Sequence, residues 1–308
     1  MTQHQSSHHT PIPDPWRFDQ IKLKSGITLR VARAGSGPPI VMLHGFPECW
    51  YSWRHQLRAL SDRFDCVAVE MRGYGESDAP VGVANYALDQ LVGDVADLIE
   101  ALGYQRATVV GHDWGGAVAW ATALMRPDVV DRLIVMNCPH LERMSHALRR
   151  NPRQMLRSWY MLFFQIRRIP EWAFRRHNYE ALINALRNGT IQKNVFTADD
   201  LEYFRAAFRN PYSLTAAINY YRANFRTGFM ARPGRGTWID RKISAPTLLI
   251  WGEQDFALGK ELTYGMEPLF TGLFEIKYIP DSGHWVQQEK PELVNQYVRD
   301  FLDAHPIA

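Results

Sequence analysis

The stretch Val109-Val110-Gly111-His112-Asp113-Trp114-Gly115-Gly116 decides the fold of this chain. It joins an apolar strand end to the pattern Gly-x-Asp-x-Gly-Gly, and an alanine-rich helical segment follows over 117–125. A strand that turns sharply into a helix pushes the residue at the turn outward, and the flanking glycines leave room because they have no Cβ. The pattern is typical of a nucleophile elbow in which Asp113 stands where Ser is usual.

Strands and helices alternate on both sides of this turn. Short apolar runs predict strands over 18–23, 27–34, 39–43, 64–69, 133–137, 246–251 and 274–279 in addition to the elbow strand. Amphipathic spacing predicts helices over 50–60, 88–102 and 291–302. We therefore expect an α/β protein with a mostly parallel, eight-stranded sheet flanked by helices.

The alternation stops between residues 139 and 236. This region contains only helical segments, interrupted by Pro152, Pro170, Gly189 and Pro211. It holds 17 Lys and Arg against 6 Asp and Glu, a local balance of +11. We expect 139–236 to be a helical cap inserted into an α/β core of residues 16–138 and 237–308. Its basic face is either a solvated surface or a contact for an acidic partner or membrane surface.

The composition is that of an ordinary globular protein. The 308 residues are 46% hydrophobic and 22% charged, and the net charge of +3 is too small to indicate nucleic-acid binding. No apolar run reaches the roughly 18 residues that span a membrane. Residues 1–15 read as a flexible leader without the pattern of a secretory signal. The composition leaves a homodimer open.

The cysteines bear on the cellular compartment of the protein, and the known binding motifs bear on whether it uses a cofactor or metal. Cys49, Cys66 and Cys138 are odd in number and lack metal-binding spacing, which favours reduced thiols and a cytoplasmic location. No phosphate loop, dinucleotide fingerprint or zinc-binding pattern is found in the sequence. We therefore expect no cofactor and no metal.

Three reactive side chains, Asp113, Asp255 and His284, follow predicted strands at their carboxyl ends. Parallel sheets place active sites at this edge, and the order nucleophile, acid, His is that of an α/β-hydrolase. A carboxylate with a reference pKa of about 3.9 is ionised at neutral pH, so Asp113 can attack without a base. His284, oriented by Asp255, is then available to activate a water molecule in a second step.

Attack by Asp113 on an sp3 carbon would form an alkyl-enzyme ester, which water then hydrolyses. The second step creates an oxyanion, and the expected donors to it are the backbone N–H groups of Phe46 and Trp114. Pro47 is expected to hold the Phe46 loop, with a cis peptide bond as one way of doing so.

Several motifs of the chain resemble those of the soluble α/β-hydrolase-fold epoxide hydrolases, from about Trp16 to Leu302. They are His44-Gly45-Phe46-Pro47-Glu48, Trp50-Tyr51-Ser52-Trp53-Arg54, Arg72-Gly73-Tyr74-Gly75-Glu76-Ser77, Gly111-His112-Asp113-Trp114-Gly115-Gly116 and Gly283-His284-Trp285. The resemblance implies that a small apolar epoxide and water are converted to a vicinal diol. It also implies that two cap tyrosines, Tyr160 and Tyr221, hydrogen-bond the epoxide oxygen.

The implied tyrosines make chemical sense. A phenol with a pKa near 10 stays protonated at neutral pH yet can donate to a developing alkoxide. Tyr220 and Tyr221 point to different faces of a helix, so one of them lines the site, and the motif favours Tyr221. We also expect Phe46, Trp114 and Phe164 to line the substrate pocket.

The family pattern is broken at Glu70, where a shorter acid is more usual, and at Cys49, where Ser is common. We interpret both as variation in packing. His44 and His112 adjoin the site and are expected to satisfy hydrogen bonds beneath its loops. Asp128 and Asp131 could replace Asp255 as the acid, although turn or helix-end roles are expected for them.

Two other functions remain as alternatives. A haloalkane or haloacid dehalogenase of the same fold also uses an Asp nucleophile, but halide leaves without a proton, so paired phenols have no purpose there. A non-catalytic binding protein with a hydrolase-like fold would have lost at least one catalytic residue. The tyrosine pair and the complete triad therefore favour an epoxide hydrolase.

Overall fold

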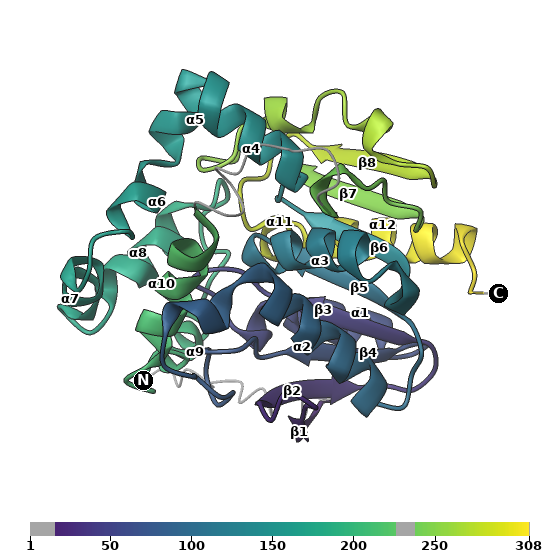
Figure 1. The fold of residues 1–308 in the computed structure, drawn as a ribbon, viewed down its shortest axis with the longest axis horizontal. Coiled ribbons are helices and arrows are strands. Elements are labelled where there is room, and N and C mark those ends of the chain that lie inside the picture. Colours follow the sequence, from purple (N-terminus) through teal and green to yellow (C-terminus); the bar gives the residue numbers. More distant parts are fainter. Residues whose placement is uncertain (1–15, 226–237, 308) are drawn as a thin grey trace, which may run out of the picture.

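An eight-stranded sheet forms the centre of the molecule in the computed structural model, which describes residues 16–225 and 238–307 (Figure 1). The strand order is β1-β2-β4-β3-β5-β6-β7-β8. The β1–β2 and β2–β4 pairs are antiparallel, and the other neighbours pair in parallel. The expected α/β fold with a mostly parallel, eight-stranded sheet is thus confirmed. The strands are β1 (Arg17–Lys22), β2 (Thr28–Ala34), β3 (Pro39–Leu43), β4 (Asp65–Val69), β5 (Ala107–His112), β6 (Val130–Met136), β7 (Thr247–Gly252) and β8 (Phe274–Ile279).

Helices cover both faces of this sheet, because alternate residues of each strand point to opposite sides. In β3, Val41 and Leu43 join the core that packs against α2 (Leu88–Ala101) and α3 (Trp114–Met125). Ile40 and Met42 join the core of α1 (Arg54–Leu60) and α12 (Pro291–Ala304). All five residues of β3 are buried, which explains why the central strands are continuous apolar runs.

Among the described residues, seven α-helices lie between β6 and β7, on one side of the sheet in Figure 1. We call this set of helices the cap. The leader expected over 1–15 and the final part of the expected cap, 226–236, lie outside the described residues. The cap helices are α4 (Leu141–Arg150), α5 (Pro152–Arg157), α6 (Trp159–Phe163), α7 (Ile169–Arg175), α8 (Glu180–Asn188), α9 (Ala198–Ala206) and α10 (Ser213–Asn224).

Some boundaries differ from the expected ones. The helix after Asp113 begins at Trp114 rather than Ala117, because Gly115 lets it lie directly on β3, where a Cβ would overlap the Leu43 carbonyl. β6 begins three residues before the expected start at 133. The helix expected over 50–60 begins as a 3-10 turn and becomes α1 at Arg54.

Shorter segments complete the connections between these elements. The helix α11 (Val286–Glu289) has only four residues, too few for its periodicity to be recognised in the sequence. No helix within 16–225 or 238–307 is long and apolar enough to cross a membrane. The 3-10 segments are η1 (Trp50–Trp53), η2 (Val83–Tyr86), η3 (Pro127–Val129), η5 (Trp238–Asp240), η6 (Lys260–Thr263) and η7 (Glu267–Leu269).

Candidate active site

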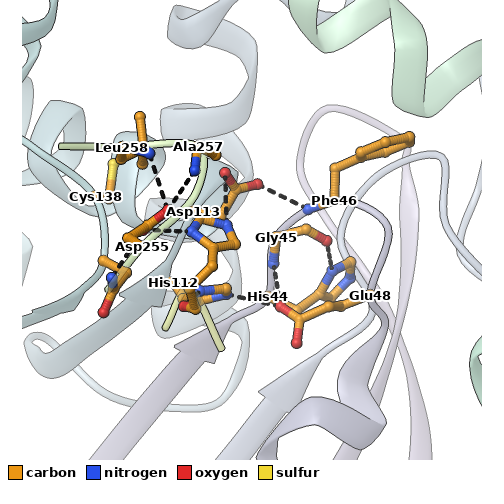
Figure 2. Close-up of polar contacts among 12 residues, drawn as sticks. His44, Gly45, Phe46, Glu48, His112, Asp113, Cys138, Asp255, Ala257 and Leu258 are labelled. Atoms are coloured by element: carbon orange, nitrogen blue, oxygen red, sulfur yellow. Dashed lines mark hydrogen bonds and ion pairs between the residues drawn. The ribbon is translucent and has the colours of Figure 1, made fainter. Parts of the chain in front are cut away.

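Asp113 occupies the sharp turn between β5 and α3. Its backbone has φ 50° and ψ −118°, a conformation that costs a residue with a Cβ about 1–3 kcal/mol. The neighbouring loop leaves room for the side chain, because a Cβ at Gly45 would overlap Asp113. The Phe46 N–H donates a 2.9 Å hydrogen bond to Oδ1 of Asp113 (Figure 2). The Phe46–Pro47 peptide bond is cis, the form given above as one way for Pro47 to hold this loop.

His284 and Asp255 reach the same place from the ends of β8 and β7. Nδ1 of His284 donates to Oδ2 of Asp255 at 2.7 Å, and its Nε2 lies 3.6 Å from Oδ2 of Asp113. Oδ1 of Asp255 accepts hydrogen bonds from the N–H groups of Ala257 and Leu258, at 2.8 and 2.9 Å. The three residues that the sequence singled out at separate strand ends therefore lie together.

Asn137 is a site residue that sequence reasoning missed. Its Nδ2 donates to Oδ2 of Asp255 at 2.8 Å, and its Oδ1 accepts the Gly252 N–H at 2.8 Å. The amide thus holds the acid in place against the end of β7. The signal was present in the sequence, since Asn137 is a polar residue at the carboxyl end of the strand predicted over 133–137.

The charges of the three residues stabilise one another. Burial alone would raise the pKa of Asp113, but the His284 imidazole, whose Nε2 lies 3.6 Å away, holds the pKa below its ordinary value. The same balance of burial against His284 keeps the pKa of Asp255 low. Burial would lower the pKa of His284, but Asp255 and Asp113 outweigh it and raise the pKa well above its usual value. These shifts favour the ionised form of both carboxylates and the protonated form of His284.

A small cavity of about 40 Å³ lies above Asp113, large enough for a few water molecules. Tyr160 and Tyr221 of the cap face it, with ring centroids 5.9 Å apart. The cavity is much smaller than a typical ligand pocket, so most substrates require the lining side chains to move apart. The lining residues are Asp113, Trp114, Ala117, Cys138, Pro139, Met144, Tyr160, Met161, Tyr221 and Leu258.

Both cap tyrosines are held in the neutral, protonated form. Burial and the negative charge of Asp113 raise the pKa of Tyr160 and of Tyr221 well above the ordinary phenol value. A hydrogen bond with the Trp114 side chain opposes this shift at Tyr221 without cancelling it. Because an indole only donates, the Tyr221 oxygen accepts this bond and its own proton stays available.

The structure separates the two adjacent tyrosines of α10. The Tyr220 hydroxyl donates to the Arg72 carbonyl at 2.7 Å, whereas Tyr221 faces the cavity. Phe46 and Phe164, which the sequence assigned to the pocket wall, pack against the Tyr221 ring with centroids 5.8 and 4.7 Å away. They support the cavity wall from behind and are not among the residues that line it.

A buried polar cluster lies beneath the triad. Nδ1 of His112 lies 2.7 Å from Oε2 of Glu48, and its Nε2 lies 2.8 Å from the His284 carbonyl oxygen. The other Glu48 oxygen accepts a 2.6 Å hydrogen bond from Gln288. His44 accepts the Met71 N–H at Nε2, and burial lowers its pKa to about 4. Both histidines thus make hydrogen bonds beneath the loops, as expected, and Glu48 is the partner that the sequence did not reveal.

The remaining candidates lie away from the triad. Asp128 pairs with Arg126 and Asp131 with Arg106, whereas the carboxylate beside Nδ1 of His284 is that of Asp255. Glu70 and Cys49 are buried and do not line the cavity above Asp113. Among residues 16–225 and 238–307, no three His, Cys, Asp or Glu side chains are grouped in a way that could hold a metal ion.

A sharp strand-to-helix turn at Asp113, followed along the chain by Asp255 and His284 at later strand ends, is the arrangement of the α/β hydrolase fold. Residues 38–291 match the family of the α/β hydrolase fold, and the chain belongs to this family. Within it, the chain is a member of the epoxide hydrolases, as the following relatives show.

The relatives cover most of the chain. Over 284 residues it is 37% identical to Epoxide hydrolase 4 of Mus musculus, covering 90% of this chain and 77% of the mouse protein. It is 39% identical over 297 residues to Epoxide hydrolase 1 of Caenorhabditis elegans, covering 94% and 71%. A crystal structure of an epoxide hydrolase variant from Bacillus megaterium, complexed with its product, superimposes with a TM-score of 0.86 at 32% identity, covering 92% and 100%.

Proposed function

We propose that this protein hydrolyses epoxides to vicinal diols through a covalent ester on Asp113. The observation that carries the proposal is the pairing of an ionised Asp113 with two protonated phenols, Tyr160 and Tyr221, around one cavity. A nucleophile and proton donors on the same cavity suit a reaction in which a C–O bond breaks and leaves an alkoxide.

In the first step, a carboxylate oxygen of Asp113 attacks one epoxide carbon, and the bond from that carbon to the ring oxygen breaks. Tyr160 and Tyr221 hydrogen-bond the ring oxygen and protonate it as its charge develops. The proton is replaced by the one that the resting His284 imidazolium carries, so the step ends with a hydroxyalkyl ester and a neutral His284.

Ester formation itself prepares the second step. It removes the charge of Asp113, one of the two carboxylates that raise the pKa of His284. The neutral imidazole then takes a proton from water, which attacks the Asp113 carbonyl carbon. Phe46 N–H, already 2.9 Å from Oδ1, and the N–H of Trp114 stabilise the oxyanion. Collapse of this intermediate releases the diol and restores the ionised Asp113 and the imidazolium.

The contact between Trp114 and Tyr221 supports epoxide opening over dehalogenation. In a dehalogenase, an indole N–H beside the nucleophile would hold the departing halide. Here the Trp114 side chain is hydrogen-bonded to Tyr221. The halide would also meet the Tyr160 and Tyr221 phenols, whose protons it does not need.

We expect the purified protein to convert small apolar epoxides to diols and to release no halide from haloalkanes of similar size. Ring opening uses the two phenols, whereas the departing halide finds no free indole donor at Trp114. Diol formation by gas chromatography and halide release by a colorimetric assay measure both outcomes in parallel. Fast halide release without diol would make the protein a dehalogenase and refute the proposal.

Removal of either cap phenol is expected to slow ring opening. Tyr160→Phe and Tyr221→Phe should each lower the rate of ester formation roughly 10- to 100-fold, because one proton donor remains, and the double variant should lose about 10³-fold or more. Rapid-quench measurement of ester formation isolates this step. The matched control is Tyr220→Phe, whose hydroxyl bonds the Arg72 carbonyl instead. A double variant with near-normal ester formation would exclude the tyrosines as proton donors.

A further inference from the structure

The outer side of the cap exposes apolar side chains that a solvated surface does not need. Leu156, Trp159, Leu162 and Trp172 are 75%, 62%, 62% and 61% exposed. They belong to α5, α6 and α7, which follow one another along the outer edge of the cap in Figure 1. Clustered exposed apolar residues mark interaction surfaces. We call the following set the cap patch: Met155, Leu156, Trp159, Leu162, Ile166, Ile169 and Trp172.

Arginines are interspersed with the cap patch. Residues 149–176 contain eight arginines and a single acid, Glu171. That acid is buried and already paired with Arg222 at 2.6 Å, so it does not neutralise the patch. Six of the eight are exposed and form no ion pair with any described residue: Arg150, Arg153, Arg167, Arg168, Arg175 and Arg176.

We propose that the cap patch docks on the surface of an anionic lipid bilayer. Trp, Leu and Ile side chains on short helices can enter the boundary between headgroups and acyl chains, while arginines bind the lipid phosphates. The patch supplies both kinds of group and carries no free carboxylate that an anionic surface would repel. The lipid phosphates would thereby offset the net charge of +11 that residues 139–236 carry.

A second copy of the chain fits this surface poorly. A twofold contact places the same patch against itself, so that the arginines of one copy would face those of the other. The only acid of the segment, Glu171, is held by Arg222 and cannot pair with them. An anionic bilayer removes this repulsion, because the phosphates provide the opposite charge.

The cap patch and the cavity share a helix. In α6, Trp159 and Leu162 are exposed, whereas Tyr160 and Met161 line the cavity above Asp113. If the proposed function holds, an apolar epoxide dissolved in the bilayer would meet the cap at the helix that carries a proton donor. Docking would then bring the helix that carries Tyr160 to the surface where such a substrate is most concentrated.

The test measures binding to vesicles without any epoxide, so it does not depend on the proposed activity. Sedimentation with vesicles that are roughly one quarter phosphatidylglycerol should retain the protein, and pure phosphatidylcholine vesicles should not. Arg153→Gln combined with Arg167→Gln should lower the partition coefficient roughly 25-fold, about fivefold for each charge. The control with the same loss of charge, Lys22→Gln combined with Lys242→Gln, lies outside the cap and should change it less than twofold.

A second variant tests the apolar part of the surface. Leu156→Ser combined with Leu162→Ser removes two exposed side chains, and the binding that persists at high salt should disappear. Equal losses in the cap and control variants, or equally weak binding of the unaltered protein to both kinds of vesicle, would overturn the proposal. So would a dimer, seen by sedimentation velocity, that the leucine variant dissociates without any change in vesicle binding. Absence of diol formation would refute the proposed function and leave the vesicle result standing.

Discussion

The variant Asp113→Ala is expected to lose turnover by roughly 10⁴-fold or more while keeping its fold. Asp113 is the carboxylate that would form the covalent ester, and no other described carboxylate lines the cavity above it. The low pKa of Asp113 makes it ready to attack at neutral pH without a base. Diol formation measures the rate, and circular dichroism with thermal unfolding measures the fold.

Two further variants control this result. Asp113→Asn keeps an oxygen that can accept the Phe46 N–H but cannot attack as a carboxylate, so it should be similarly inactive. Asp128→Ala makes the same substitution in η3, just past the end of α3, where the acid pairs with Arg126, and should remain fully active. If Asp113→Ala kept even a tenth of the normal kcat with any epoxide, Asp113 would not be the nucleophile.

The second large effect is expected at His284. His284→Gln should still form the ester, with water in place of the imidazolium replacing the proton used in ring opening, and should slow ester hydrolysis by about 10²–10⁴-fold, because the second step needs a base. The protein should therefore consume about one equivalent of epoxide and then stall. Intact-protein mass spectrometry should show the added mass of one epoxide, and peptide mapping should place it on Asp113.

His146→Gln provides the matched control, since His146 is an exposed residue of α4 in the same chain. It should turn over normally and accumulate no adduct. For the unaltered protein, a single turnover in ¹⁸O-labelled water should place the label in the Asp113 carboxylate, because water attacks the carbonyl carbon of the ester. A label that appeared only in the diol would mean that water opens the epoxide directly, and the covalent mechanism would be excluded.

The sheet and its order of reactive residues were accessible from the sequence because both depend on local patterns. A strand buried on both faces must be apolar at every position, as at 39–43, so it is visible without a partner strand. The turn at Asp113 needs glycine wherever a Cβ would overlap neighbouring backbone. A Cβ at position 115, for example, would overlap the Leu43 carbonyl. Since parallel strands end at one edge, their end residues were expected to meet there, and they do.

Residues that act by facing another part of the chain could not be assigned in this way. Asn137 and Glu48 were missed because their partners, Asp255 and His112, are 118 and 64 positions away along the chain. The pocket wall was expected at Phe46 and Phe164, but these rings pack behind Tyr221, and Met161 and Leu258 line the cavity instead. The sequence does not distinguish an apolar residue that lines a cavity from one that packs behind the lining residues.

The sequence by itself determined the α/β class, the strained turn at Asp113 and the order of Asp113, Asp255 and His284 along the chain. Hydrophobic periodicity and the need for glycine both depend on residues that are close together in the sequence. The resemblance favoured Tyr221 over Tyr220, but it is the tertiary structure that places Tyr221 at the cavity, because the rotation of α10 depends on what the helix packs against. The same holds for the basic cap. Its charge was countable in the sequence, but the exposure of Leu156 and Trp159 beside those arginines follows from how the short helices fold over the site.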